Sequence, residues 1–317
     1  MITGKTLECP ICSHINFNNL EFIDVAHQHM LYAPSSPERQ IQLNAVLNHT
    51  VRTYQMLECQ NCQLEFANPA IAPNSNWYDI AYKTLDLYPQ NRWEFKFVIE
   101  NFQTNEKLLE LGCGSGEFLK ICKNNNISAI GLDFSEEAVK QCHAAGLDVQ
   151  LLDIDEKFER VISNIKIITA FHVLEHLPDP IKIFELAGKV SSAETTLLVT
   201  VPSCYRPSRI LKTPDFLDQP PHHMTRWNRK SLKEIGLRTH WLLDKFYFEP
   251  ISIKASCWWV TRDMWIYKFL LSFYFKNPKL EQILRIFLFP FAFISRYMFH
   301  KRMKGFTMLA SYKYSNK

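Results

Sequence analysis

The sequence predicts an α/β protein in which helices cover both faces of a parallel sheet. Between Lys107 and about Pro250, short apolar runs alternate with helical patterns, which is typical of such a sheet. A glycine-rich loop follows the first run in "KLLELGCGSGEFL", residues 107–119. The chain has 317 residues, of which 47% are hydrophobic and 21% charged, as in globular proteins long enough for one core domain and further modules.

Five apolar runs are expected to be strands of this sheet, and "GFTMLASYKY" near the end of the chain is expected to be its final strand. The five ranges are 107–111, 128–132, 148–152, 165–170 and 195–201. Ahead of them, residues 77–102 repeat aromatic and aliphatic side chains at intervals of three and four. That spacing predicts helical structure before the sheet begins.

The glycine loop indicates a nucleotide-type cofactor. Gly112, Gly114 and Gly116 let the backbone turn sharply and approach a ligand, and the helix after them presents free N–H groups. The spacing is G-x-G-x-G, not the G-x-G-x-x-G of dinucleotide sites. Glu110, two residues before the first glycine, suits a cofactor with a positively charged end.

Two further acids are expected at the ends of the next strands. Asp133 follows Gly112 by 21 residues and can accept both ribose hydroxyls, while Asp153 can reach the adenine amino group. The loop lacks a lysine, which disfavours a triphosphate ligand. The alternative is that these acids cap helices, since Asp is a favoured N-cap residue.

Four motifs now stand in order: "LLELGCGSG", "GLDFSEEAV", "LLDID" and "FHVLEHLPDP". Together they resemble class I S-adenosylmethionine-dependent methyltransferases, in the branch that carries V-L-E-H-x-x-D-P after the fourth strand. The resemblance covers residues 80–250 and the last strand. It implies a Rossmann-like, doubly wound, seven-stranded sheet with one antiparallel strand.

The resemblance also implies S-adenosylmethionine as the cofactor. Glu110 and Gly112 would lie near its methionine part, Asp133 at the ribose and Asp153 near the adenine. The full set of expected cofactor-binding residues is Glu110, Gly112, Gly114, Gly116, Asp133, Phe134, Asp153, Ile154 and His172.

Methyl transfer needs a general base only when the acceptor is a poor nucleophile, such as a sugar hydroxyl. Two clusters offer bases: His172, Glu175 and His176 in "FHVLEHLPDP", and His222 and His223 in "DQPPHHMTRWN". His223 is the first choice as the base and His176 the second. The alternative for Glu175 and His176 is that they cap and orient the helix that starts near Pro180.

Two C-x-x-C pairs near the N-terminus predict a structural zinc site with the ligands Cys9, Cys12, Cys59 and Cys62. The 46 residues between the pairs exceed the ribbon spacing of about 15–20, so the intervening segment is an insertion. A redox role is the alternative, although redox C-x-x-C motifs open a helix after a strand. The front end resembles the zinc-binding part of some bacterial sugar methyltransferases, which favours a carbohydrate acceptor.

Residues 264–275 and 283–299 form a hydrophobic helical insertion. Neither is expected to span a membrane: the longer run has 17 residues, contains Arg285 and Arg296, and is interrupted by Pro290. From residue 250 onward the chain has 12 Lys/Arg and two acids, against 24 Lys/Arg and 30 acids before it. A helix lying in an anionic membrane surface is one interpretation, and a lid or a homodimer interface is the other.

The predicted domain boundaries follow from these features. Residues 1–70 form the zinc-binding module, 71–105 a connecting helical segment, 106–250 the methyltransferase domain, 251–303 the insertion and 304–317 the final strand.

The predicted function is S-adenosylmethionine-dependent methyl transfer to an oxygen or carbon of a small-molecule or lipid-linked acceptor, with a sugar favoured. An RNA methyltransferase and a non-catalytic S-adenosylmethionine-binding scaffold are the alternatives. Residues 1–62 contain only Lys5, Arg39 and Arg52 as permanent cations, which disfavours nucleic acid as a partner. The first dozen residues lack the apolar core of a signal peptide, so a cytoplasmic protein is expected, and peripheral contact with the inner membrane face through 264–299 is one of the two interpretations of that segment.

Overall fold

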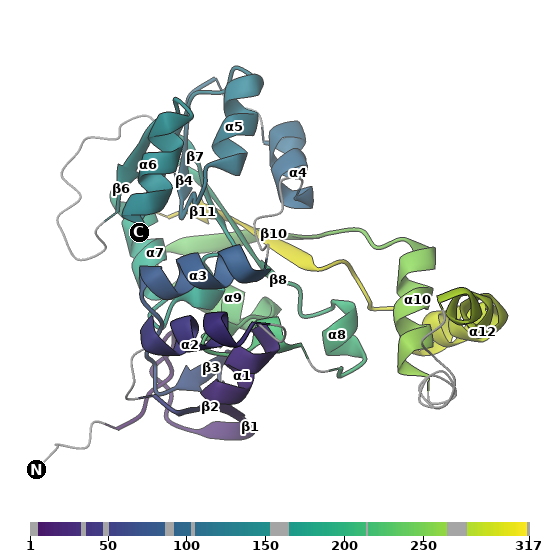
Figure 1. The fold of residues 1–317 in the computed structure, drawn as a ribbon. Helices are drawn as coiled ribbons and strands as arrows, with labels where there is room; N and C mark the ends of the chain where they lie inside the picture. The colour runs from purple at the N-terminus through teal and green to yellow at the C-terminus, as the bar shows by residue number, and fades with distance from the viewer. Residues whose placement is uncertain are drawn as a thin grey trace, which may run out of the picture. The chain divides into compact units, whose positions relative to one another are not determined.

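A computed structural model describes residues 6–32, 36–46, 51–85, 92–102, 105–152, 165–213, 215–264 and 278–315. The chain forms two compact units (Figure 1). The larger unit comprises Met1–Val201, Phe216–Tyr247 and Leu309–Lys317. The smaller comprises Pro202–Asp215 and Phe248–Met308.

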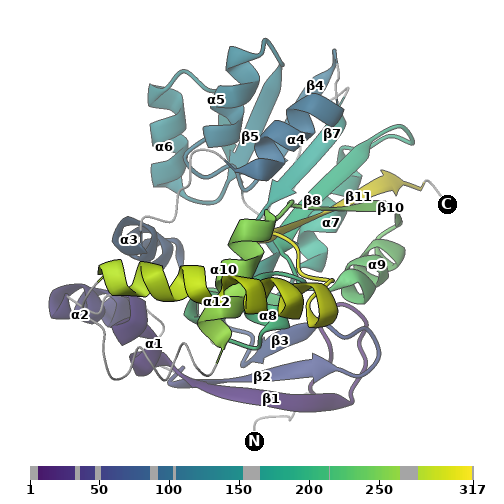
Figure 2. The same cartoon turned by 90° about the vertical axis from the view of Figure 1, so that its right-hand side faces the viewer.

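A seven-stranded sheet forms the centre of the larger unit, with the order β10-β11-β8-β7-β4-β5-β6 (Figure 2). Its strands are β4 (Lys107–Leu111), β5 (Ala129–Asp133), β6 (Val149–Leu151), β7 (Ile165–Phe171), β8 (Thr196–Pro202), β10 (Trp241–Phe248) and β11 (Thr307–Tyr314). The pairs among β4, β5, β6, β7 and β8 are parallel. The predicted seven-stranded sheet is confirmed, and every strand range expected from the sequence lies within two residues of a strand.

The last strand runs antiparallel to both of its neighbours. Its final residue, Tyr314, donates from its backbone N–H to Thr195, just before β8, and Ser315 donates to His240, just before β10. At the other end, the backbone N–H of Glu249, just after β10, donates to the carbonyl of Thr307. The sheet is therefore mixed, as the resemblance implied.

Helices cover both faces of the sheet. On one face lie α4 (Trp93–Asn101), α5 (Glu117–Asn124) and α6 (Glu136–Ala144), and on the other α7 (Ile181–Lys189) and α9 (Arg229–Arg238) (Figures 1 and 2). Phe95 of α4, Phe118 of α5 and Phe171 of β7 pack ring against ring beneath the first face. The helical segment expected at 77–102 is two helices, α3 (Ser75–Leu85) and α4, and residues 86–91 lie outside the described residues.

A second, four-stranded sheet holds the cysteine pairs, with the order β1-β2-β3-β9. It consists of β1 (Phe17–Asp24), β2 (Thr53–Cys59), β3 (Glu65–Asn68) and β9 (Thr225–Arg226). Two helices, α1 (Val25–Tyr32) and α2 (Pro37–Val46), lie in the chain between β1 and β2, within the segment predicted to be an insertion between the cysteine pairs. The contribution of β9 from far along the chain was not predicted.

The smaller unit contains α8 (Pro207–Ile210), α10 (Ile253–Asp263) and α12 (Pro278–Phe299). The last two lie side by side (Figures 1 and 2) around a small core of Cys257, Val260, Ala292 and Met303. In α12, Gln282–Phe299 has a mean hydropathy of 1.3 and is only 11% buried, so by length and composition alone the helix could cross a membrane. The sequence disfavours a membrane span partly because the apolar run has only 17 residues. That limit on length does not hold, because α12 extends beyond this run. Of the predicted run 264–275, only Met264 lies within the described residues.

Candidate active site

The glycine loop between β4 and α5 has the backbone that the spacing predicted. Gly112, Gly114 and Gly116 have φ angles of +74°, +51° and +76°, a region that side-chain-bearing residues rarely adopt. A Cβ atom on Gly112 would lie 2.5 Å from Cγ2 of Val173, and one on Gly116 would lie 2.5 Å from Leu147. The loop therefore passes close to both neighbouring segments and tolerates only glycine at these two positions.

Asp133 ends β5 and faces the glycine loop. Its Oδ2 accepts a hydrogen bond from the backbone N–H of Gly114 at 2.7 Å, and its Oδ1 accepts one from Ser135 at 2.9 Å. The N-cap of α6 is Ser135, whose hydroxyl accepts from the N–H of Ala138. The capping alternative is thus wrong for Asp133, which joins the loop to the strand end where a ribose is expected.

Glu110 lies in β4 and is 3% exposed. Among the residues that the structure describes, no hydrogen-bond partner reaches its Oε2 atom. Burial raises the pKa of Glu110 well above its ordinary value, and the nearby charge of Asp133 raises it further. A cationic ligand group would satisfy this carboxyl, as the ammonium group of S-adenosylmethionine would, so the residues at the loop fit that cofactor.

The other expected cofactor contacts are described only in part. Phe134 is 49% exposed directly after Asp133, and offers an apolar surface that a planar base could cover. Asp153 and Ile154 lie outside the described residues, which end at Leu152 on this segment.

His172 lies directly after β7 in a buried network of two glutamates. Its Nδ1 lies 2.9 Å from Oε1 of Glu175, and its Nε2 lies 3.2 Å from Oε1 of Glu94 in α4. Burial opposes the charged imidazolium, but the charge of Glu175 and the hydrogen bonds that the ring donates to both glutamates outweigh it and raise the pKa of His172 to about 9. The structure therefore gives Glu175 and His172 a shared ion-pair network, while their expected catalytic and cofactor roles remain predictions.

His176, His222 and His223, expected from two separate motifs, come together. His176 ends the short 3-10 helix η1 (Leu174–His176), and its ring centroid lies 4.9 Å from those of both His222 and His223. The rings of His222 and His223 are stacked with centroids 4.3 Å apart. Burial lowers the pKa of His176 well below its ordinary value, and the two neighbouring histidines lower it further, so its ring is neutral at pH 7.

Hydrogen bonds to backbone carbonyls of η1 hold the segment that carries His222 and His223 in place. The N–H of Met224 donates to the carbonyl of Glu175 at 2.6 Å, and the hydroxyl of Thr225 donates to Leu174 at 3.0 Å. On its other side the segment forms β9, where Thr225 pairs with Phe66 of β3. The cysteine-bearing sheet therefore supports the histidine segment directly.

The four cysteines converge as the sequence predicted. Sγ of Cys9 lies 3.5 Å from that of Cys62, Sγ of Cys12 lies 3.5 Å from that of Cys59, and all four lie within 4.8 Å of one another. Hydrogen bonding from Cys62 lowers the pKa of the Cys9 thiol to about 5 and raises that of Cys62 well above its ordinary value. Four buried thiols this close cannot all ionise unless a cation lies among them.

The two C-x-x-C turns are also matched in backbone geometry. Ser13 and Gln63 each follow the first cysteine of their pair by four residues, have φ angles of +54° and +61°, and donate to the carbonyls of Cys9 and Cys59. Neither pair opens a helix after a strand, which disfavours the redox alternative. The arrangement is compatible with a tetrahedral metal site.

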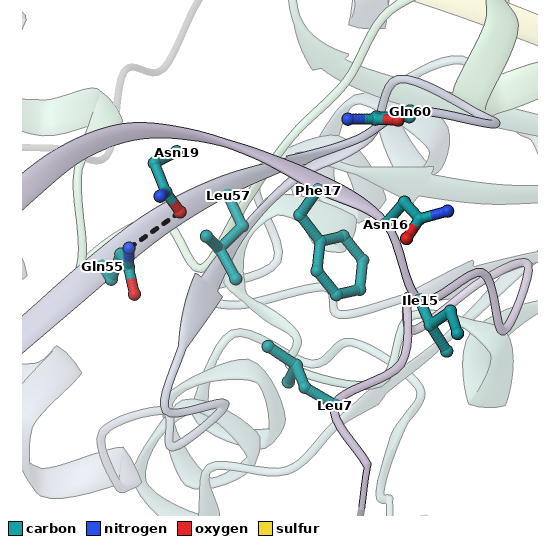
Figure 3. Close-up of a pocket in the computed structure, with 8 residues that line it drawn as sticks. All are labelled: Leu7, Ile15, Asn16, Phe17, Asn19, Gln55, Leu57 and Gln60. Atoms are coloured by element: carbon teal, nitrogen blue, oxygen red, sulfur yellow. Dashed lines mark hydrogen bonds between the residues drawn. The ribbon is translucent and has the colours of Figure 1, made fainter.

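A groove lies elsewhere, on the four-stranded sheet (Figure 3). It has a volume of about 490 Å³ and lies beside β1 and β2. Its lining residues are Leu7, Ile15, Asn16, Phe17, Asn19, Gln55, Leu57 and Gln60. None of these residues is titratable or belongs to the predicted site, so this groove is not where the sequence places the chemistry.

Comparison with known proteins identifies the central part of the chain. Residues 87–239 match the family model described as a methyltransferase domain. The ubiquinone biosynthesis O-methyltransferase of Aliivibrio fischeri (strain ATCC 700601 / ES114) is 26% identical over 124 residues, which are 37% of this chain and 53% of that protein. The chain thus spans about half the length of the curated relatives it matches.

Two solved structures are among those to which the chain is similar. One is a methyltransferase in complex with the Trm112 methyltransferase activator of Haloferax volcanii, with 17% identity, a TM-score of 0.47, and coverage of 70% of this chain and 88% of that one. The other is a S-adenosylmethionine-dependent methyltransferase from Archaeoglobus fulgidus, with 20% identity, a TM-score of 0.45, and coverage of 69% and 91%. At these identities and TM-scores, neither carries a conclusion about the substrate.

Proposed function

We propose that this chain, in which residues 87–239 form a class I S-adenosylmethionine-dependent methyltransferase domain, transfers the methyl group to a hydroxyl oxygen of a small or lipid-linked acceptor. A sugar is the acceptor class that we favour. When bound, S-adenosylmethionine supplies a methyl carbon already activated by its sulfonium. The protein then has to hold the cofactor, align the acceptor and exclude water.

The observation that carries the proposal is the position of Tyr78 between two parts of the site. Its ring packs edge-on against Phe134, with centroids 6.4 Å apart, and against His176, with centroids 5.4 Å apart. Phe134 directly follows Asp133, where the ribose is expected, and His176 belongs to the histidine cluster. The expected cofactor residues and the imidazoles therefore both lie next to Tyr78, which supports a site for methyl transfer.

The histidine cluster supports an acceptor that must lose a proton. A hydroxyl oxygen is a weak nucleophile until its proton leaves, and buried imidazoles are the groups that handle such a proton at neutral pH. The curated relatives are named as O-methyltransferases, which supports oxygen rather than carbon as the methylated atom. The sugar rests on the resemblance of the cysteine-bearing front end to that of sugar methyltransferases.

We further propose that Cys9, Cys12, Cys59 and Cys62 hold a structural Zn²⁺. Four thiolate ligands fill the tetrahedral coordination of the ion and leave no open position, so this ion would not take part in the chemistry. Its role would be mechanical: β3 follows Cys62 and pairs with β9, which lies directly after the histidine cluster. Asn228 also donates to the carbonyl of Gln63 at 2.6 Å, which ties the second cysteine turn to the start of α9.

For α12 we propose a position in the surface of an anionic membrane, reached from the cytoplasm. Its outward face is apolar and exposed: Ile283, Ile286, Phe287, Phe291, Ile294, Tyr297 and Met298. Both arginines of the helix make contacts within the smaller unit. The guanidinium of Arg285 lies over the ring of Trp258, and that of Arg296 donates to the carbonyl of Met303. Lys301, Arg302 and Lys304 follow the helix and are exposed, which suits anionic headgroups.

The test of the acceptor class uses methyl-labelled S-adenosylmethionine, the purified protein and an extract of its source cells. The extract is separated into lipid, soluble small-molecule and RNA fractions, and label is counted in each. Label in the lipid fraction supports a lipid-linked acceptor and a membrane role for α12. Label only in the soluble fraction makes α12 a lid or a dimer contact, and label in RNA would overturn the proposed acceptor.

A further inference from the structure

We propose that His176, His222 and His223 form a second metal site, which binds a divalent transition-metal ion such as Zn²⁺ through three imidazoles. The site is separate from the four cysteines, and Tyr78 packs between His176 and Phe134 of the expected cofactor residues. One ring nitrogen from each of the three histidines lies within 4.8 Å of the others. Three histidines with one open position form the ligand set of catalytic zinc sites.

The main evidence for this metal site is the hydrogen bonding of the three histidine rings. Nδ1 of His176 lies 2.8 Å from the carbonyl oxygen of His222, and Nδ1 of His222 lies 2.7 Å from that of Leu217. Nδ1 of His223 lies 3.2 Å from Oδ1 of Asp218. A carbonyl can only accept, so Nδ1 of His176 and of His222 carries the proton, and the carboxylate of Asp218 favours the same tautomer for His223.

In all three rings the lone pair is therefore on Nε2. Metal-binding histidines show this same pattern, because donation from one ring nitrogen to a carbonyl or carboxylate orients the other toward the ion. The pair of His223 and Asp218 corresponds to the carboxylate–histidine–metal arrangement that raises the basicity of a ligand. Chance packing of three histidines would not require the same nitrogen to be engaged each time.

The surroundings hold the three rings at nearly fixed positions. His222 and His223 are 5% and 8% exposed, and their segment is bonded to η1 on one side and to β3 on the other. Arg226, which lies near the cluster, is neutralised by ion pairs with Glu21, Glu65 and Asp218 at 2.8, 3.2 and 3.4 Å. The pre-formed geometry and the local carboxylates both favour a cation.

The metal site would give the proposed methyl transfer a means of activating the acceptor. Only this chemical role, and not the binding of the ion, rests on the proposed function. An acceptor hydroxyl in the open coordination position would have its pKa lowered by the ion, and its proton would pass to water. The oxygen would then form a bond to the methyl carbon, while the carbon–sulfur bond breaks and its electron pair stays on sulfur. In this account His223 is a ligand and not the general base expected from the sequence.

The test is the metal content of the full chain, which does not depend on turnover. The protein is dialysed against Zn²⁺, freed of excess ion and measured by elemental analysis, alongside His176→Gln, His223→Gln and the exposed-site control His27→Ala. We expect two zinc ions per chain in wild type and in the control, and one in each cluster variant, with binding of S-adenosylmethionine retained as the check on folding. One zinc in all four proteins would overturn the proposal.

Cobalt substitution separates the two sites by their spectra. Cysteine ligands give thiolate-to-cobalt charge-transfer bands, whereas a three-histidine site gives only ligand-field bands. We expect His223→Gln to lose the second set and keep the first, and Asp218→Asn to weaken binding of the second cobalt ion by about 10- to 100-fold. Unchanged spectra in both variants would assign all bound metal to the cysteines. Absence of label transfer with two metals bound would instead count against the proposed function alone.

Discussion

Tyr78 of α3 packs edge-on against His176, with ring centroids 5.4 Å apart and an angle of 89° between the rings. The same ring contacts Phe134, which follows the strand end that carries Asp133. One aromatic side chain from the segment after the cysteine-bearing sheet therefore links the expected cofactor position to the histidine cluster. This contact brings α3 next to both parts of the candidate site.

Asp133→Asn should weaken binding of S-adenosylmethionine at least about tenfold, since a hydrogen bond to a charged group contributes about 1.5–3 kcal/mol. Isothermal titration calorimetry measures the change. Asp148→Asn, the same substitution at an exposed carboxylate just before β6, is the matched control and should leave binding unchanged. Equal affinity in the two variants would mean that Asp133 does not hold the ribose.

Cys59→Ser should remove about one zinc per chain, because a tetrahedral site loses one of its four ligands. It should also lower the melting temperature, since β2 ends at this residue and β3 pairs with the histidine segment. Elemental analysis and thermal unfolding give the two readouts, with Cys204→Ser as the control. A full complement of zinc in Cys59→Ser would refute the cysteine site.

The buried His172 network predicts a pH-dependent stability. The pKa of His172 is raised to about 9 in the folded protein, above the value of about 6.5 expected in the unfolded chain. Its contribution is therefore fully present below pH 6.5 and is lost as the pH rises through 9, to a total of about 3 kcal/mol. Denaturant unfolding between pH 6.5 and 9.5 measures the loss.

The control for this prediction is His172→Gln, which has no titrating ring. Its stability should change much less with pH over the same window, whatever its absolute value. The lowered pKa of His176 affects the stability mainly below pH 6.5, and it does so equally in both proteins, so it cancels in the comparison. Parallel pH profiles for the two proteins would show that His172 is not charged in the folded state.

Phe287→Glu places a charge on the exposed apolar face of α12, where Phe287 is 69% exposed. Sedimentation with vesicles containing phosphatidylglycerol should show at least a tenfold loss of binding relative to wild type. Phe22→Glu alters a similarly exposed phenylalanine, 73% exposed on β1, and should bind like wild type. If neither variant changes vesicle binding but Phe287→Glu alters the oligomeric state, the face is a contact between copies of the chain.

The central sheet could be predicted because its strands are buried on both faces and appear as uninterrupted apolar runs, such as "TTLLVTV" at 195–201. The glycine loop and the cysteine pairs could be predicted because chemistry fixes their local spacing. By contrast, β10 is at the edge of the sheet and largely half-exposed, so its sequence "WLLDKFYF" shows no clean period. The pairing of β3 with β9 joins residues about 160 apart, which no local pattern indicates.

The candidate site, like the fold, has parts that could be predicted from local motifs and parts that depend on tertiary contacts. The sequence separated His176 from His222 and His223 by more than 40 residues, and only the chemistry of the two motifs linked them. Asp218 and Glu94 were not predicted at all, although they hold His223 and His172. These two carboxylates contact their histidines only in the folded chain. In the sequence they cannot be told apart from surface carboxylates, because no motif or residue spacing marks them.

The most direct test of the account measures transfer of labelled methyl groups into cell extract by wild type and by His176→Gln and His223→Gln, after calorimetry has shown that all three bind S-adenosylmethionine. The account predicts a labelled product with wild type and a loss of at least about 100-fold in both variants, because each variant removes a ligand of the ion that would lower the pKa of the acceptor hydroxyl. Label transfer at the wild-type rate by the variants would contradict it, as would the absence of product from a wild-type protein that binds the cofactor.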